Sequence, residues 1–162
     1  MLEILQDKTE EIERLIEKYP SRRSVMLPLL WIVQRKTGWV SQQAMQEVAE
    51  VLGVTIAEVY EVVSFYTMFQ QKPVGRFHLA LCDTLSCAIC GTHEIVAYLK
   101  TKYGIEKNKV TPDGLFSLEL VECIGACADA PALLLNEDLK KNLTPKSIDE
   151  MIDGCRALAQ AV

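Results

Sequence analysis

The sequence predicts an α+β protein with a helical N-terminal half and a C-terminal half of short strands and helices. Up to residue 65, apolar side chains recur at the three- and four-residue spacing of amphipathic helices. A breaker cluster, Lys-Pro-Val-Gly at residues 72–75, then interrupts the chain. Beyond it, short apolar runs and one alternating run indicate strands. The change of period places a boundary near residue 72 and predicts a helical lobe over residues 1–71 and a second domain over residues 72–162.

Four helices are expected in the first half. Gly38 and Gly53 follow apolar-periodic segments, and glycine easily takes the left-handed conformation that ends a helix. Ser41 suits the N-cap position, and Thr55 with Glu58 three residues later fits a capping box. The expected ranges are residues 2–19, 24–37, 41–53 and 56–65.

The second half should fold in the order strand, helix, strand, strand, helix. A helix around residues 95–99 should end at Gly104, and Thr144 with Pro145 gives an N-cap and a first-turn proline for the last helix. The strands are expected at residues 76–82, 115–123 and 132–135, and the last helix is expected to reach about residue 159. This order suits a small α/β sandwich of the thioredoxin type behind a helical lobe.

Composition narrows the function classes. With 49% hydrophobic residues and no apolar run near the roughly 20 residues of a membrane helix, we expect a soluble protein without membrane insertion. No basic stretch followed by an apolar core opens the chain, so we expect a cytoplasmic location. The net charge is −5 and the basic residues are scattered, which argues against nucleic acid as a partner.

Four cysteines carry the chemistry. Cys82 and Cys87 follow the first expected strand, and Cys123 and Cys127 follow the second, so each pair is expected on a loop. Two such loops at neighbouring strand ends could bring four thiolates together, which is what a 2Fe–2S cluster requires, two per iron. Gly125, between the second pair, leaves room for the cluster and lets the backbone turn its amides toward the sulfurs.

Other interpretations of the cysteines remain open. Cys82, Cys87 and Cys90 have the spacing of plant-type ferredoxins, with Cys123 as a possible fourth ligand, although this leaves Cys127 unused. Structural zinc could occupy the same four thiolates as an iron cluster. The C-x-x-C formed by Cys87 and Cys90 could also be a dithiol redox pair.

The remaining candidate groups receive no ligand role. Cys155 lies within the last expected helix and should behave as a small buried hydrophobe. His78 and His93 are isolated, and isolated histidines are more often structural or exposed than ligands. The sequence contains neither G-x-G-x-x-G after a strand nor G-x-x-x-x-G-K-[ST], so no nucleotide site and no independent catalysis are expected.

Taken together, these motifs resemble the NuoE family, the small thioredoxin-like 2Fe–2S subunit of respiratory complex I. The resemblance rests on the two cysteine pairs and on four segments that extend it over nearly the whole chain. These segments are Gly38-Trp39-Val40-Ser41, Glu61-Val62-Val63-Ser64-Phe65-Tyr66, Pro73-Val74-Gly75-Arg76 and Asn142-Leu143-Thr144-Pro145. Cys90 departs from the family pattern, in which no thiol is expected at that position.

The resemblance implies an electron-transfer subunit of NADH-quinone oxidoreductase, with one 2Fe–2S cluster on Cys82, Cys87, Cys123 and Cys127. Its partner would be a NuoF-like flavoprotein that binds FMN and NADH, in a complex that keeps the chain peripheral to the membrane. The cluster would lie on the far side of the flavin from the main electron chain and store electrons there. Related subunits serve NAD-dependent hydrogenases and formate dehydrogenases, and a free-standing thioredoxin-like ferredoxin is a further alternative.

Overall fold

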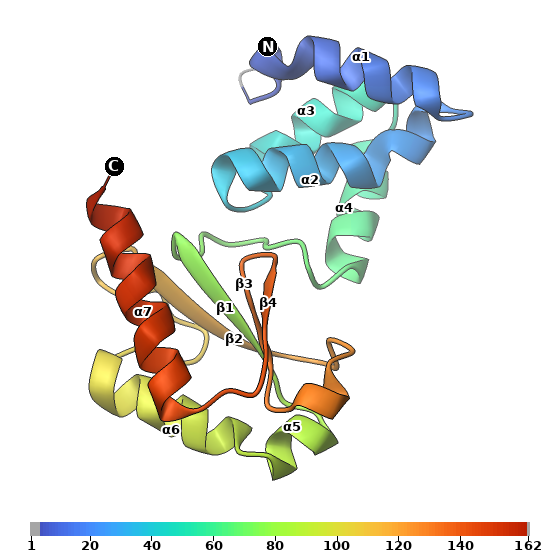
Figure 1. Ribbon diagram of the computed structural model, residues 1–162. Coiled ribbons are helices and arrows are strands. Elements are labelled where there is room, and N and C mark those ends of the chain that lie inside the picture. Colours follow the sequence, from blue (N-terminus) through green and yellow to red (C-terminus); the bar gives the residue numbers. More distant parts are fainter. Residues whose placement is uncertain (1–3, 162) are drawn as a thin grey trace. The chain divides into compact units, whose positions relative to one another are not determined.

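The computed structural model describes residues 4–161, shown as a ribbon in Figure 1. The chain divides into two compact units, Met1–Pro73 and Val74–Val162. Within the described residues there are seven α-helices and one four-stranded sheet, so the predicted α+β class is confirmed. The first helix was expected to begin at residue 2, which lies outside the described residues.

The first unit is entirely helical over its described part. A 3-10 turn precedes the first helix, and a second 3-10 turn replaces the start of the expected second helix. The elements are η1 (Gln6–Lys8), α1 (Thr9–Lys18), η2 (Arg22–Val25), α2 (Met26–Thr37), α3 (Gln42–Leu52) and α4 (Ile56–Phe65).

The helix ends of this unit follow the local rules that the sequence suggests. Gly38 and Gly53 end α2 and α3 with φ of +82° and +68°. The Ser41 hydroxyl accepts a hydrogen bond from the Ala44 amide at 3.1 Å. Thr55 and Glu58 form the complete capping box of α4. These contacts satisfy amides that a helix otherwise leaves unpaired at its first turn.

An apolar core holds the four helices together, and one buried carboxylate lies beside it. Leu29 and Val33 of α2, Val48 of α3 and Val59 of α4 are fully buried in this core. Glu47 of α3 is only 3% exposed and accepts hydrogen bonds from the backbone amides of Ile4 and Leu5 at 2.9 and 3.1 Å.

The second unit contains the sheet. Its elements are β1 (Phe77–Cys82), α5 (Leu85–Ile89), α6 (Thr92–Tyr103), β2 (Phe116–Val121), η3 (Cys127–Asp129), β3 (Leu133–Leu135), β4 (Asp138–Lys140) and α7 (Pro145–Gln160). The strand order is β2-β1-β3-β4, with β1 and β2 parallel and the other two pairs antiparallel.

Helices α6 and α7 cover one face of this sheet (Figure 1). Ile95 and Leu99 of α6 and Ile148 and Ile152 of α7 are buried against β1 and β2. The parallel register pairs Phe77 with Phe116 and continues to the last residue of each strand. The carboxyl ends of β1 and β2 therefore reach the same edge of the sheet.

Three elements of this unit differ from the sequence expectation. The segment that carries Cys82 and Cys87 was expected to be a loop, but Cys87 lies in the five-residue helix α5. Strand β4 was not expected, because Asp138-Leu139-Lys140 offers a single apolar residue; it is an edge strand joined to β3 through Asn136, whose φ is +55°. The expected strand over residues 115–123 is shorter and ends at Val121.

Over residues 4–161, none of the helices combines the length and the apolar character needed to cross a bilayer.

Candidate iron–sulfur site

Both cysteine pairs lie at the carboxyl ends of β1 and β2. Cys82 is the last residue of β1, and Cys87 lies one turn into α5; both thiols are buried. Cys123 follows β2 by two residues and Cys127 begins η3; both are exposed. Because β1 and β2 are parallel neighbours, with Cys82 opposite Val121, the segments that leave them run over the same edge of the sheet.

The second pair is held by the turn between its members. The Cys123 and Cys127 sulfurs are 3.4 Å apart, and the Gly125 amide donates to the Cys123 sulfur at 3.4 Å. Gly125 has φ of +79°, a conformation that side-chain-bearing residues rarely adopt. The hydrogen bonds from the Gly125 amide and from Cys127 lower the pKa of Cys123, whereas the proximity of Cys123 raises the pKa of Cys127.

The first pair is embedded in the protein. Burial acts to raise the pKa of Cys82, but hydrogen bonds with Thr84, Cys87 and the Ile124 amide outweigh it and lower that pKa. Burial raises the pKa of Cys87, and the neighbouring Cys82 raises it further. Ile124 belongs to the segment between Cys123 and Cys127, so the two cysteine segments meet at this point.

The two pairs also interact with one another. The charge of Cys82 acts on both Cys123 and Cys127, and the charge of Cys127 acts on Cys87. As the side chains stand in residues 4–161, no three or more His, Cys, Asp or Glu groups form a site for a metal ion. The four thiols lie instead as two neighbouring pairs.

The donor set suits a 2Fe–2S cluster. Four thiolates supply two ligands to each iron, which matches two adjacent pairs of sulfurs. The Gly125 amide points at the Cys123 sulfur and the Ile124 amide lowers the pKa of Cys82; both would offset the negative charge of a bound iron–sulfur cluster. Ala126, beside them, is a small buried residue that leaves space at the turn.

The other two cysteines are placed differently. Cys90 follows the last residue of α5 and is exposed, whereas the interactions of Cys87 run to Cys82 and Cys127. The charge of Cys127 acts on Cys87, which favours Cys127 over Cys90 as the fourth thiol and disfavours the plant-type arrangement. Cys155 of α7 is 3% exposed and packs in the apolar core of the second unit, as predicted for a buried hydrophobe.

The two histidines contact hydroxyl and carboxylate groups. The Nδ1 atom of His78 lies 2.8 Å from the Ser117 hydroxyl, and its Nε2 atom lies 3.3 Å from a Glu119 carboxylate oxygen. His93 is exposed and pairs with the carboxylate of Asp83 at 3.7 Å. Both histidines therefore have the structural or exposed character expected from the sequence.

Two threonines beside the cysteines were not singled out in the sequence. The Thr84 hydroxyl is 3.2 Å from the Cys82 sulfur. The Thr92 hydroxyl, fully buried, donates to the carbonyl oxygen of Cys82 at 2.8 Å and fixes the backbone where β1 ends. The sequence position of Thr84, two residues after Cys82, could have predicted its contact with Cys82, because short hydroxyl side chains often form hydrogen bonds with nearby groups in turns.

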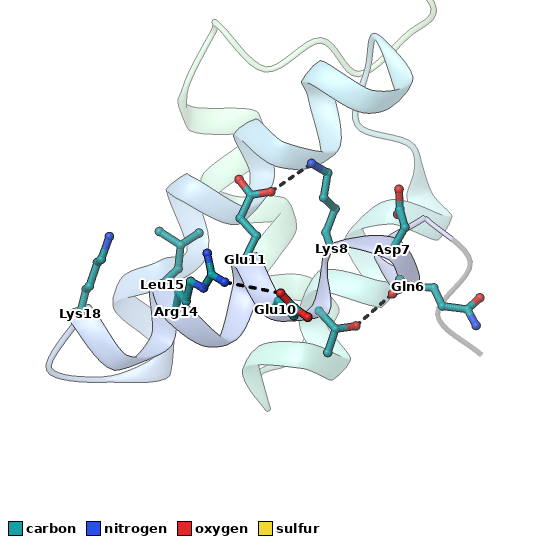
Figure 2. Close-up of a pocket in the computed structure, with 9 residues that line it drawn as sticks. Gln6, Asp7, Lys8, Glu10, Glu11, Arg14, Leu15 and Lys18 are labelled. Atoms are coloured by element: carbon teal, nitrogen blue, oxygen red, sulfur yellow. Dashed lines mark hydrogen bonds and ion pairs between the residues drawn. The ribbon is translucent and has the colours of Figure 1, made fainter.

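A separate cavity of about 730 Å³ lies along η1 and α1 (Figure 2). It is lined mainly by polar and charged side chains that pair with each other, Lys8 with Glu11 at 3.1 Å and Arg14 with Glu10 at 3.5 Å. Such exposed pairs at helical spacing are typical of a solvated helix face. We assign no function to it.

Comparisons with known proteins identify the family to which the chain belongs. The family model for thioredoxin-like 2Fe-2S ferredoxins matches residues 12–156. The chain is 44% identical to the E 2 subunit of the NADH-quinone oxidoreductase of Rhizobium meliloti (strain 1021), over 91% of this chain and 88% of that protein. It is 40% identical to subunit 2 of the NADH-quinone oxidoreductase of Thermus thermophilus, over 93% of this chain and 85% of that protein.

Among solved structures, a chain of an NAD+-reducing NiFe hydrogenase in the H2-reduced state superposes with a TM-score of 0.71 at 24% identity. The match covers 82% of this chain and 22% of the hydrogenase chain, and it supports the fold.

The fold and the paired cysteines define an iron–sulfur protein built on a thioredoxin-like domain. The chain belongs to the thioredoxin-like 2Fe-2S ferredoxin family, and its cofactor is a 2Fe–2S cluster.

Proposed function

We propose that Cys82, Cys87, Cys123 and Cys127 hold the 2Fe–2S cluster, and that the chain is the small electron-transfer subunit of an NADH-quinone oxidoreductase. One observation carries the proposal. Two cysteine pairs meet beyond the ends of two parallel strands, in a chain 44% identical to a subunit of that enzyme in Rhizobium meliloti. We also propose that residues 1–71 and 72–162 are the two domains of this subunit.

The bound cluster supplies one-electron redox chemistry. Cys82 and Cys87 are buried and would keep water from the irons that they bind, whereas Cys123 and Cys127 are exposed. The exposed pair would hold a bound cluster where a partner protein could approach it at the surface. The amide of Gly125 donates to a ligand sulfur, which stabilises added negative charge.

The partner that we propose is a NuoF-like flavoprotein subunit that binds NADH and FMN. A flavin takes up a hydride as two electrons and can release them singly, a conversion that an iron–sulfur cluster does not perform. This chain has no dinucleotide-binding fingerprint of its own in its sequence. It therefore serves as a non-catalytic subunit and depends on the flavoprotein for electrons from NADH.

We propose further that the chain works in a larger respiratory complex on the cytoplasmic side of the membrane. The relatives favour this over a hydrogenase. Those at 40–44% identity carry NADH-quinone oxidoreductase names, whereas the hydrogenase chain is 24% identical and supports the fold alone.

Reconstitution tests the proposal. The purified chain, mixed with the flavoprotein, should show the electron paramagnetic resonance signal of a reduced 2Fe–2S cluster when NADH is added. NADH should give no signal with this chain alone, whereas dithionite, a strong direct reductant, should give it. Rapid reduction by NADH in the absence of any flavoprotein would refute the proposed electron path. A chain that contains zinc and no iron would refute the cluster.

A further inference from the structure

Thr84 occupies an N-cap position but does not cap its helix. Ser41, Thr55 and Thr144 precede α3, α4 and α7, and each accepts a hydrogen bond from a first-turn amide with its side-chain oxygen. Thr84 precedes α5 in the same extended conformation, with φ of −86° and ψ of 168°, yet its side chain makes no capping hydrogen bond. A threonine at an N-cap usually satisfies an amide. The hydroxyl of Thr84 is thus directed elsewhere.

The hydroxyl turns toward the thiols. Its oxygen lies 3.2 Å from the Cys82 sulfur. The pKa of Cys123 is lowered first by the Gly125 amide, then by Cys127, and also by a hydrogen bond from the Thr84 side chain. The hydroxyl therefore lies within hydrogen-bond distance of the Cys82 sulfur, and it also influences the pKa of Cys123 in the second pair.

The direction of this hydrogen bond is set by ligation. Between a free thiol and a hydroxyl, either group can donate the proton. A cysteine bound to iron is a thiolate and has no proton to give, so only the Thr84 hydroxyl can then be the donor. Hydrogen bonds to an ionised acceptor are roughly twice as strong as those between neutral groups.

We propose that Thr84 is a positioning residue whose hydroxyl donates to the Cys82 sulfur and raises the reduction potential of the cluster. The inference rests on the proposed ligand set. One added electron increases the negative charge on the sulfurs, so a donor aimed at them stabilises the reduced state more than the oxidised state. The reduction potential rises as a result.

Thr84 is a side-chain donor, so a substitution can remove its hydrogen bond. The donors from Gly125 and Ile124 are backbone amides, which every variant at position 84 retains. Thr84→Val replaces the hydroxyl by a methyl group of similar size, whereas Thr84→Ser keeps the hydroxyl. Thr55→Val is the matched control, because it removes a threonine hydroxyl that caps a helix of the first unit.

The experiment is a reductive titration of the full-length, cluster-loaded chain with dithionite. Electron paramagnetic resonance measures the reduced fraction at each ambient potential, and iron and sulfide are quantified for every variant. For Thr84→Val we expect unchanged iron content and about a tenfold lower ratio of reduced to oxidised cluster at a fixed potential. This ratio corresponds to a midpoint about 59 mV more negative for a one-electron couple. Thr84→Ser and Thr55→Val should keep the wild-type midpoint.

Several outcomes would overturn the inference. A wild-type midpoint in iron-replete Thr84→Val would show that the hydroxyl does not influence the cluster. A midpoint shifted equally in Thr84→Ser and Thr84→Val would show that the potential does not depend on the hydroxyl, because serine keeps it and valine lacks it. If Thr84→Val loses its iron, Thr84→Ala is compared with Thr84→Ser. Loss of iron from both variants that lack the hydroxyl would show that Thr84 helps to hold the cluster and would contradict a role in setting its reduction potential. Failure of this inference can be distinguished from failure of the proposed function, because in the second case the wild-type chain itself would give no 2Fe–2S signal.

Discussion

A Cβ atom on Gly75 would lie 2.4 Å from the carbonyl carbon of Phe116 and 2.7 Å from the amide nitrogen of Ser117. The chain ahead of β1 therefore lies flat against the start of β2. The Gly75 amide donates to the Ser117 hydroxyl at 2.9 Å, and the next hydrogen bond of this segment runs from the Arg76 amide to the Gly114 carbonyl at 3.1 Å. Only glycine fits at this position without movement of the backbone.

Gly75→Ala should destabilise the second unit. The added methyl group meets backbone atoms that cannot rotate away, and overpacking of this kind usually costs about 1–3 kcal/mol. Urea unfolding followed by circular dichroism measures the loss. The two tryptophans, Trp31 and Trp39, lie in the first unit, so circular dichroism rather than their fluorescence follows the second unit.

Gly154→Ala is the matched control. Gly154 lies within α7, and a Cβ atom there meets nothing within 4 Å. Replacement of a helix-interior glycine by alanine should stabilise the chain by about 0.5–1 kcal/mol. Equal effects of the two alanine substitutions would contradict the close packing of Gly75 on β2.

Local signals account for the parts of the fold that the sequence predicted. Gly38 and Gly53 end helices because they take the left-handed conformation, and the capping box of Thr55 and Glu58 acts within one turn. Strand β4 was missed because its pairing with β3 is set by the turn at Asn136, whereas its own residues have little strand character. Tertiary context decides such edge strands.

The candidate site was only partly predictable from the sequence. The cysteine spacing predicts two pairs near strand ends, and the parallel pairing of β1 and β2 explains how the pairs meet. The part played by Thr84 could not be predicted, because a threonine two residues after a cysteine has several possible partners. The partner depends on helix α5, which is too short to leave an apolar period in the sequence.

Substitution of single cysteines separates ligands from other thiols. Serine at position 82, 87, 123 or 127 should lower the iron content or alter the visible and paramagnetic spectra, because an oxygen ligand binds iron differently from a thiolate. Cys90→Ser should keep the wild-type spectrum, since Cys90 is exposed and the interactions of Cys87 run to other thiols. Cys155→Ala, in the apolar core, should also keep it.

The plant-type arrangement makes the opposite prediction for two of these variants. There, Cys90→Ser would lose the cluster and Cys127→Ser would retain it. Iron and sulfide analysis of both proteins, prepared in parallel, distinguishes the two ligand sets.

Glu47 should stabilise the first unit through its buried carboxylate. It accepts hydrogen bonds from the amides of Ile4 and Leu5 and is 3% exposed. Glu47→Ala leaves these amides without that acceptor, and we expect a loss of about 1–3 kcal/mol in the free energy of unfolding. Urea unfolding monitored by tryptophan fluorescence gives the value. Glu50→Ala, at an exposed site of the same helix, should change it by less than about 0.5 kcal/mol.

The carboxylate of Asp149 links α7 to α6 and should make the stability of the second unit depend on acid pH. It accepts hydrogen bonds from the Tyr103 hydroxyl at 2.6 Å, the Lys102 ammonium at 2.7 Å and the Tyr98 hydroxyl at 2.8 Å. The contact with Lys102, followed by those with the two tyrosines, lowers the pKa of Asp149 from 3.8 to about 2. The ionised form of Asp149 is therefore more strongly stabilised in the folded state than in the unfolded state.

The sign of the pH effect follows from this lowered pKa. A carboxyl group with a depressed pKa in the folded state contributes stability that is fully present above its unfolded value, near 3.8, and is lost as the pH falls toward about 2. Asp149→Asn should thus be less stable than the wild type at neutral pH, and the difference should shrink between these two values. Urea unfolding followed by circular dichroism over this pH range measures the difference in stability. Loss of the cluster in acid affects the wild type and Asp149→Asn alike. Asp153→Asn, exposed on the same helix, is the control, and a difference between wild type and Asp149→Asn that does not vary with pH would refute the assignment.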